Sequence, residues 1–335
     1  MMSRKLLAGL MLITIMLSAC TPAAAPAPIV PLAPTKSAPT AALTIAPTAT
    51  PTEPPSPAPI KLTDGLGRSI ELAAPAQRIV SIAPSNTEIL FALGAGKQVV
   101  GREEMSDYPA EAKNVTSIGS VFQKINTEAI VALKPDLILA AEINSPEQVK
   151  ALEDLKLNVY YLQNPKTFDD LYKNLETVGV LTGRSAEATK LNESLKARYD
   201  AVIKKLAAAK DAPTVFYEID ATDPTKPYTS GPGTFIDLVI GLAAGKNIGA
   251  ELKGAFAQIS SEELVKQNPA IIVLGDALYG VTPESVAQRP GWNALNAVKA
   301  KQVFAFDDNL ISRPGPRLID GLEQMAKLVH PELFK

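Results

Sequence analysis

Short apolar runs rich in Val, Ile and Tyr recur between longer amphipathic segments from about residue 61 to the C-terminus. Runs that are apolar throughout are typical of strands buried on both faces, as in a parallel sheet covered by helices on either side. The predicted strands span residues 78–83, 98–101, 136–140, 159–162, 214–219, 270–275 and 302–306. Their alternation with helical segments predicts an α/β fold.

A long amphipathic segment separates the first four predicted strands from the last three. From Ser185 to about Lys210 the apolar positions are three or four residues apart, which places them on one face of a helix. They are Ala188, Leu191, Leu195, Tyr199, Val202 and Leu206. At ~1.5 Å per residue this helix is nearly 40 Å long. It predicts a rigid spine at 185–210 between an N-terminal α/β lobe at 61–184 and a C-terminal α/β lobe at 211–335, both Rossmann-like.

The start of one helix is marked by a local motif. Ser85 and Glu88, three residues later, match a capping box ahead of the segment ILFALGAG. We therefore interpret Ser85 as a helix cap rather than as a nucleophile.

One stretch of the chain is echoed 134 residues later. Residues 122–139, FQKINTEAIVALKPDLIL, and residues 256–273, FAQISSEELVKQNPAIIV, share an aromatic residue, a glutamate and a proline at the same spacing. A second echo, LGAGKQV at 93–99 and LAAGKNI at 242–248, precedes the first in each half. Chance similarity of a generic helix–Pro–strand unit explains one short match, but two matches in the same order favour duplicated lobes.

The first twenty residues, MMSRKLLAGLMLITIMLSAC, predict a secretory signal of the lipoprotein type. The apolar run of about a dozen residues is short for a transmembrane helix, which needs ~20. Cys20 ends the signal and is the only cysteine of the chain. We predict that Cys20 is acylated and anchors an extracytoplasmic protein to the cell membrane, because more than one acyl chain gives stable anchoring.

A tether is predicted between this anchor and the lobes. Residues 21–60 hold 12 of the 28 prolines, and only Lys36 and Glu53 are charged. Such a segment cannot bury enough apolar surface to offset its ordering entropy, so we predict that it is disordered and extended. A glycosylated stalk is the alternative for this mixture of Thr and Pro.

The composition excludes several classes of function. The formal net charge of −2 provides no basic footprint for nucleic acid. His330 is the only histidine, which excludes a multi-histidine metal site, and the single cysteine excludes a Cys/His site. No G-x-S-x-G nucleophile motif occurs. We therefore predict neither a metal nor a resident cofactor, and a protein that is not an enzyme.

The order of motifs resembles a known family of transport proteins. The segments are RIVSIAPSNTEILFALGAGKQVVG, SDYPAEAKNVTSIGSVFQKINTEAIVALKPDLIL, YTSG and SRPGPRLIDGLEQMAKLVHP. They are similar to the helical-backbone (class III) substrate-binding proteins of ABC importers, above all the cobalamin-binding branch that is grouped with ferric-siderophore and haem binders. The resemblance covers about residues 60–335. It implies a monomeric lipoprotein that binds a small molecule in a cleft between its lobes and delivers it to a permease dimer with ATPase subunits.

The resemblance also implies roles for particular residues. The expected ligand-binding residues are Pro84, Ser85, Asn86, Met105, Tyr108, Phe122, Tyr228, Phe256, Asn309 and Arg313. In this family one glutamate on each lobe docks to arginines of the two permease subunits, and the matching positions are Glu128 and Glu262, the echoed pair. A glutamate in the first turn of a helix also suits the helix dipole, which is the simpler explanation.

The identity of the ligand stays open among related molecules. Met105, Ala141 and Leu310 stand where the cobalamin-binding branch has aromatic residues. Arg313 is the one obvious cleft arginine, whereas anionic ferric chelates usually need several. A haem binder would have to use Tyr108 or Tyr228 as its iron ligand. We expect a corrinoid, with a ferric siderophore or haem as the alternative and a surface-anchored enzyme or adhesion module as a remote one.

Overall fold

A computed structural model of the chain describes residues 59–122 and 124–335. The predicted signal peptide at 1–20, Cys20 with its anchor, and nearly all of the tether at 21–60 lie outside the described residues. Within the part of the chain that is described, no helix is both long enough and apolar enough to cross a membrane.

The N-terminal lobe is built on a parallel sheet with the strand order β4-β3-β5-β6. The strands are β3 (Ile79–Ser81), β4 (Val99–Arg102), β5 (Leu137–Ala141) and β6 (Val159–Leu162). Every residue of β3, β5 and β6 is buried, as expected for continuous apolar runs covered on both faces. All four strands predicted for this lobe are confirmed. A hairpin of β1 (Ile60–Thr63) and β2 (Ser69–Leu72) precedes them and was not predicted.

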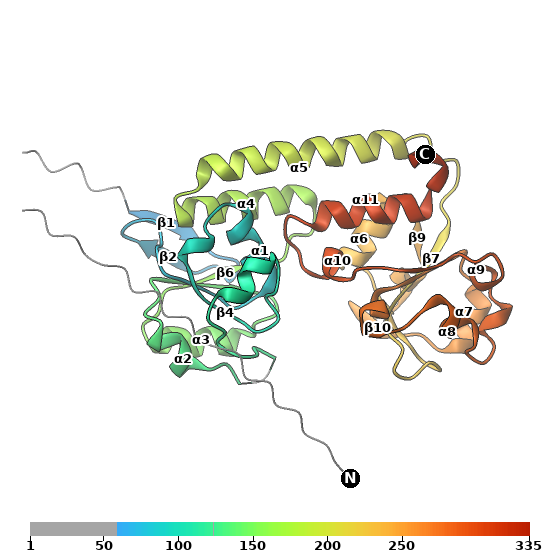
Figure 1. The fold of residues 1–335 in the computed structure, drawn as a ribbon, viewed down its shortest axis with the longest axis horizontal. Coiled ribbons are helices and arrows are strands. Elements are labelled where there is room, and N and C mark those ends of the chain that lie inside the picture. The colour runs from blue at the N-terminus through green and yellow to red at the C-terminus, as the bar shows by residue number, and fades with distance from the viewer. Residues whose placement is uncertain (1–58, 123) are drawn as a thin grey trace, which may run out of the picture. The chain divides into compact units, whose positions relative to one another are not determined.

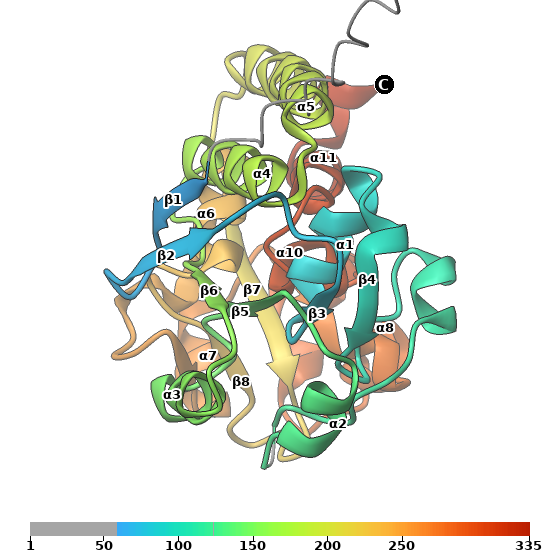
Figure 2. The ribbon, with the colours of Figure 1, turned by 90° about the vertical axis from the view of Figure 1, so that its left-hand side faces the viewer.

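Helices cover this sheet on two sides (Figure 2). The helical elements are α1 (Pro84–Ala92), α2 (Thr127–Ala132), α3 (Pro146–Asp154), α4 (Phe168–Thr182) and the 3₁₀ turns η1 (Gly96–Gln98) and η2 (Ala110–Asn114). One cluster of buried side chains includes Leu90 of α1 and Leu175 of α4. A second cluster includes Ile130 of α2 and Val149 of α3. The sheet is therefore the middle layer of an α/β/α sandwich.

The C-terminal lobe is built on a larger, mixed sheet with the order β10-β8-β7-β11-β12, and β9 also pairs with β7. The strands are β7 (Thr214–Asp220), β8 (Tyr228–Ser230), β9 (Lys246–Asn247), β10 (Phe256–Gln258), β11 (Ile271–Leu274) and β12 (Val303–Ala305). β8 and β10 are antiparallel to their neighbours, and the other pairings are parallel. The three strands predicted here, β7, β11 and β12, are confirmed.

Helices also surround this second sheet. They are α6 (Phe235–Leu242), α7 (Ser261–Gln267), α8 (Pro283–Ala287), α9 (Asn296–Lys299), α10 (Asn309–Ser312) and α11 (Leu318–Val329), with the 3₁₀ turns η3 (Ile248–Glu251), η4 (Gly275–Tyr279), η5 (Trp292–Ala294) and η6 (Pro331–Phe334). His330 caps the end of α11, where it is buried and its Nε2 lies 3.3 Å from the carbonyl oxygen of Ala244. This contact explains the lone histidine as a packing residue.

The parallel core of the second lobe repeats that of the first. The order β9-β7-β11-β12 corresponds to β4-β3-β5-β6, and the second sequence echo leads into β4 as LGAGKQV and contains β9 as LAAGKNI. The first echo forms the same local unit twice, a short helix followed by a buried strand, as α2 with β5 and α7 with β11. The shared strand order supports the prediction of duplicated lobes.

One long helix, α5 (Ser185–Leu206), connects the two lobes (Figure 1). It ends at Leu206, four residues before the predicted end. Its predicted apolar face is confirmed, since Ala188, Leu195, Val202 and Leu206 are buried and Leu191 and Tyr199 pack against the same core cluster. That cluster is continuous from the N-terminal lobe to the C-terminal lobe. The predicted fold class, two Rossmann-like lobes joined by a single backbone helix, is confirmed.

Polar contacts fix α5 to both lobes. Towards the N-terminal lobe, Asn192 donates to the carbonyl oxygen of Tyr172 at 3.0 Å. Towards the C-terminal lobe, Arg198 donates to Glu323 of α11 at 2.9 and 2.8 Å and to Asp320. The spine is therefore attached on both sides of its midpoint, which limits how far the lobes can swing about it.

The predicted capping box at Ser85 is wrong. Helix α1 begins with Pro84 at its first position, and its cap is Ala83, two residues before the predicted cap and without a side-chain hydrogen bond. Proline suits that position because the first turn needs no N–H there. The carboxylate of Glu88 instead accepts two hydrogen bonds from Arg317 of the other lobe, at 2.8 and 2.6 Å. Glu88 therefore makes a contact between the lobes and not the expected capping contact within its own helix.

Candidate ligand-binding cleft

The loops that follow the parallel strands of both lobes meet at one cleft. In α/β sheets, ligands bind beyond the carboxyl ends of the strands. In the N-terminal lobe these loops carry Ala83 to Ser85 after β3 and Asn164 after β6. In the C-terminal lobe they carry Tyr279 after β11 and Asp308 to Pro314 after β12. The two sheets thus bring their ligand-binding edges to the same space.

Two adjoining cavities make up this cleft. The first, of about 280 Å³, is lined by Ala83, Pro84, Ser85, Met105, Phe122, Ala141, Ile143, Asn164, Tyr279, Asp308, Asn309, Ser312, Arg313 and Pro314. The second, of about 220 Å³, is lined by Glu142, Asn164, Pro165, Lys166, Gly233, Thr234, Phe235, Ile236, Ala255, Phe256, Ile311 and Ser312. Asn164 and Ser312 line both, so the two cavities are neighbours. Each has walls from both lobes.

A larger hollow lies away from the cleft. It measures about 500 Å³ and runs between α5 and the C-terminal segment, lined by Arg198, Lys205, Lys327 and Phe334 among others. It is far from the strand ends, and no loop of either sheet reaches it. Size alone therefore does not identify the binding site.

The structure brings seven of the ten expected ligand-binding residues to the cleft. Pro84, Ser85, Met105, Phe122, Asn309 and Arg313 line the first cavity, and Phe256 lines the second. The two phenylalanines are unusually exposed for their type, at 68% for Phe122 and 63% for Phe256. Aromatic rings that are left in solvent at a cleft are typical of binding surfaces.

The other three expected residues do not line either cavity. Asn86 is fully buried, and its side-chain amide has no protein partner. The ring of Tyr108 lies against the guanidinium of Arg317, 3.9 Å from ring centroid to Cζ. Tyr228 is half exposed at the start of β8. For these three residues a role in ligand binding stays a prediction that the geometry does not support.

Several cleft residues were not predicted. Ile143, Asn164, Tyr279, Asp308 and Ser312 line the first cavity. Each of these residues follows a parallel strand within a few residues or lies in the helical turn that follows such a strand. The position after a parallel strand could therefore have identified them from the sequence. Tyr279 is the most exposed large apolar side chain among the described residues, at 83%.

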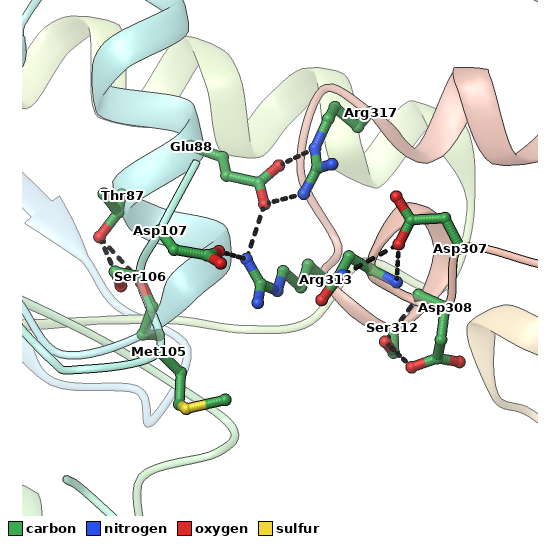
Figure 3. A network of polar contacts seen from close by, with 12 residues as sticks. Thr87, Glu88, Met105, Ser106, Asp107, Asp307, Asp308, Ser312, Arg313 and Arg317 are labelled. Atoms are coloured by element: carbon green, nitrogen blue, oxygen red, sulfur yellow. Dashed lines mark hydrogen bonds and ion pairs between the residues drawn. The ribbon is translucent and has the colours of Figure 1, made fainter. Parts of the chain in front are cut away.

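Arg313 is the cleft residue with the strongest electrostatic contacts (Figure 3). It reaches from the C-terminal lobe across to the N-terminal lobe, where its Nη1 lies 2.7 Å from Asp107 and 3.6 Å from Glu88. Burial raises the pKa of Asp107, but the hydrogen bond and the charge of Arg313 outweigh burial and hold that pKa below its usual value. Much of the charge of Arg313 is thus already neutralised within the protein.

A second carboxylate of the cleft is also satisfied by protein groups. Asp308 accepts a hydrogen bond from the hydroxyl of Tyr217 at 2.8 Å and another from Ser312. Burial raises the pKa of Asp308 above its usual value. Asn309 donates to Asp307 at 2.9 Å, which fixes the amide beside the cavity. These contacts fix the positions of Asp308 and Asn309 in the wall of the cavity.

Buried residues of the C-terminal lobe support the turn η4, which carries Tyr279. A side chain at Gly275 would lie 2.6 Å from the ring of Tyr217, so only glycine permits this approach. Asp276 is buried and accepts a hydrogen bond from the backbone N–H of Ala221 at 3.2 Å. Burial, together with the nearby charge of Glu218, raises the pKa of Asp276 to about 7. The support of Tyr279 therefore includes a titrating group.

Comparisons with known proteins agree with this geometry. The family described as "Periplasmic binding protein" matches residues 79–310. The chain is 36% identical over 282 residues to the ABC transporter substrate-binding lipoprotein YvrC of Bacillus subtilis, covering 83% of this chain and 87% of that protein. The crystal structure of the vitamin B12-binding protein BtuF of Vibrio cholerae is similar at 29% identity and a TM-score of 0.68, covering 78% of this chain and 99% of that one. A haem-binding protein of Pseudomonas aeruginosa is similar at 26% identity and a TM-score of 0.67, with 76% and 93% covered.

The raised pKa of Asp276 predicts how stability depends on pH. Between the unfolded pKa near 3.8 and the folded pKa of about 7, the folded chain holds a proton that the unfolded chain has released. The free energy of unfolding therefore falls as pH rises through this window. Asp276→Asn should remove this loss and be more stable than the parent at pH 8 by about 2–4 kcal/mol. Thermal unfolding at pH 5 and pH 8 measures the effect.

Asp220 supplies a matched control for this experiment. It is exposed at the end of β7, and its pKa is lowered because Thr222 donates hydrogen bonds to it. Asp220→Asn should therefore give no gain at pH 8. The assignment would be contradicted if the stability of Asp276→Asn relative to the parent were no greater at pH 8 than at pH 5.

Proposed function

Because the chain belongs to the periplasmic binding protein family, we propose that it captures a corrinoid of the cobalamin type in its cleft and delivers it to the permease of an ABC importer. Proteins of this family bind substrates for transporters and are not enzymes, and this class is established for the chain. The ligand and the residues that contact it are the proposal. The single observation that carries the proposal is a cleft between two lobes with exposed aromatic rings on both walls.

The lining of the cleft favours a ligand with apolar faces for aromatic rings and hydrogen-bonding groups at its edge. Phe122 and Tyr279, from opposite lobes, line the same cavity, and Phe256 lines the adjoining one. The amides of Asn164 and Asn309 and the hydroxyl of Ser85 are suited to the carboxamide groups at the edge of a corrin ring. Arg313 is already paired with Asp107 and Glu88, so it offers less to a strongly anionic chelate. The B12-binding relative supports the same choice.

Haem, or a ferric siderophore, is the second candidate. The thioether of Met105 and the phenol of Tyr279 line the first cavity, and both groups are known iron ligands in haem proteins. The haem-binding relative supports this alternative. The role expected of Tyr108 or Tyr228 as iron ligand passes to Tyr279, because Tyr279 lines the cavity and the other two do not.

The rest of the proposal concerns location and partners. The lipid anchor at Cys20 is supported by the signal sequence and by the lipoprotein relative of Bacillus subtilis. The docking role of Glu128 and Glu262 is supported by their equivalent places. Each is exposed, each is the second residue of its short helix, and neither forms an ion pair with any described residue.

Titration with three probes tests the ligand. Hydroxocobalamin, haemin and a ferric trihydroxamate are added to the purified protein, and absorbance and affinity are recorded. We expect saturable one-to-one binding of hydroxocobalamin. Phe122→Ala combined with Phe256→Ala should weaken it at least about tenfold, since truncating a buried aromatic contact commonly costs ~2 kcal/mol or more. Unchanged affinity in this folded double variant would show that the rings do not contact the ligand.

Tyr279 separates the two ligand candidates. If its ring covers a corrinoid, Tyr279→Phe should bind as the parent does, whereas Tyr279→Ala should bind more weakly. If its hydroxyl binds haem iron, Tyr279→Phe should lose both affinity for haemin and the charge-transfer absorbance of a phenolate ligand. Tight haemin binding with no corrinoid binding would overturn the first candidate in favour of the second.

Charge reversal tests the docking glutamates. Glu128→Lys with Glu262→Lys should abolish uptake and leave ligand affinity and melting temperature nearly unchanged. The reason is that a desolvated interfacial charge pair left with one partner costs ~2–5 kcal/mol. The control is Glu147→Lys with Glu284→Lys, two exposed glutamates at the same second position of α3 and α8. If both double variants reduce uptake equally, the glutamates serve their helices and not a partner.

A further inference from the structure

The two copies of the repeated unit agree in structure far more closely than in sequence. The helix α2 is capped by Asn126, which accepts from the N–H of Ala129 at 3.0 Å, and α7 is capped by Ser260, which accepts from the N–H of Glu263 at 3.1 Å. Both units end in a residue with a left-handed backbone, Lys134 at φ 48° and Asn268 at φ 46°. Residues 127–132 and 261–266 also share the same order of buried and exposed positions.

Half of the described positions that are exposed in both copies have nevertheless diverged. Lys124 corresponds to Gln258, and Ala132 corresponds to Lys266. A solvent-facing side chain is free to change when only the fold has to be kept, because surface substitutions usually alter stability very little. Exposed positions that remain identical in both copies therefore indicate a requirement other than folding.

Three exposed positions are identical in the two copies. The first is Phe122 with Phe256, and both line the cleft. The second is Glu128 with Glu262, the proposed docking pair. The third is Val131 with Val265, exposed at 44% and 38%, and the cleft lining does not include either valine. The valines are thus the matched exposed pair that neither ligand binding nor the proposed docking charge accounts for.

Each valine lies beside a docking glutamate. Residues three apart on a helix are neighbours on its surface, so Glu128 with Val131 and Glu262 with Val265 each present a carboxylate next to an isopropyl group. Ile130 and Leu264, between them in sequence, point into the core and fix the rotation of each helix. Figures 1 and 2 show α2 and α7 on different lobes, both on the side away from α5. The two pairs can therefore meet one partner at the same time.

We propose that Val131 and Val265 are the apolar halves of two equivalent docking patches, each made of one glutamate and one valine. This inference rests on the proposed function, because the partner is the permease dimer of the importer. A two-fold related pair of subunits presents the same surface twice. Each copy is expected to offer a guanidinium or ammonium group to the carboxylate and an apolar contact to the valine. The valine excludes water from the charge pair, which strengthens it.

The test uses the full chain and the permease–ATPase complex of the same organism in nanodiscs. Val131→Ser with Val265→Ser should weaken the complex at least about tenfold, since apolar area buried at an interface carries much of its stability. Ligand affinity and melting temperature should not change. Each single valine variant should cause a loss of similar size, because the patches are equivalent.

The diverged positions supply the control. Ala132→Ser with Lys266→Ser changes exposed residues next to the valines and should leave complex formation within about twofold of the parent. If the valine variant binds normally while Glu128→Lys with Glu262→Lys does not, the inference is overturned and the docking role of the glutamates stands. If the glutamate variant also binds normally, the docking part of the proposed function fails as well. A single valine whose loss has no effect overturns the equivalence of the patches.

Discussion

The geometry of the cleft depends on a buried ion-pair cluster that joins the two lobes. Glu88 in α1 is almost fully buried, and it is bound by Arg317 through two hydrogen bonds and approached by Arg313. Burial raises the pKa of Glu88, although both arginines oppose the rise. Leaving such a carboxylate without its partner costs ~3–5 kcal/mol. The cluster therefore holds the lobes at a defined separation, and Arg313 and Asp107 extend it to the edge of the ligand cavity (Figure 3).

This constraint connects ligand capture with delivery. The spine α5 is tied to α4 and α11 on one side of the molecule, and the ion-pair cluster lies between the lobes below it. Together they fix the aromatic walls of the cleft and also the spacing of α2 and α7. For the proposed docking of α2 and α7, a constant spacing between these helices allows the protein to match a two-fold partner without first reorganising. A rigid backbone thus keeps both the cleft and the proposed docking helices in place. It also leaves the cleft little ability to adapt to ligands of different size.

Much of the fold was predictable because it follows from local patterns. Seven apolar runs gave the parallel strands, and the three-to-four spacing of apolar residues gave the face of α5. The site was less predictable because its contacts are distant in sequence. Glu88 matched a capping box, but Pro84 started the helix earlier and an arginine 229 residues away took the carboxylate. The same arginine lies over the ring of Tyr108, which does not line the cleft. Tyr279 lies in a short turn with no motif, so only the position after a strand could have marked it.

The distance between the lobes shows whether the cleft is fixed. Spin labels at Glu147→Cys in α3 and Glu284→Cys in α8, in a chain with Cys20→Ser, would report it by pulsed electron resonance. A fixed cleft should give one narrow distribution that shifts by less than about 5 Å on addition of hydroxocobalamin, and that broadens when Arg317→Met breaks the ion-pair cluster. Two separate populations in the parent chain, or a shift beyond roughly 10 Å as in hinge closure, would contradict it.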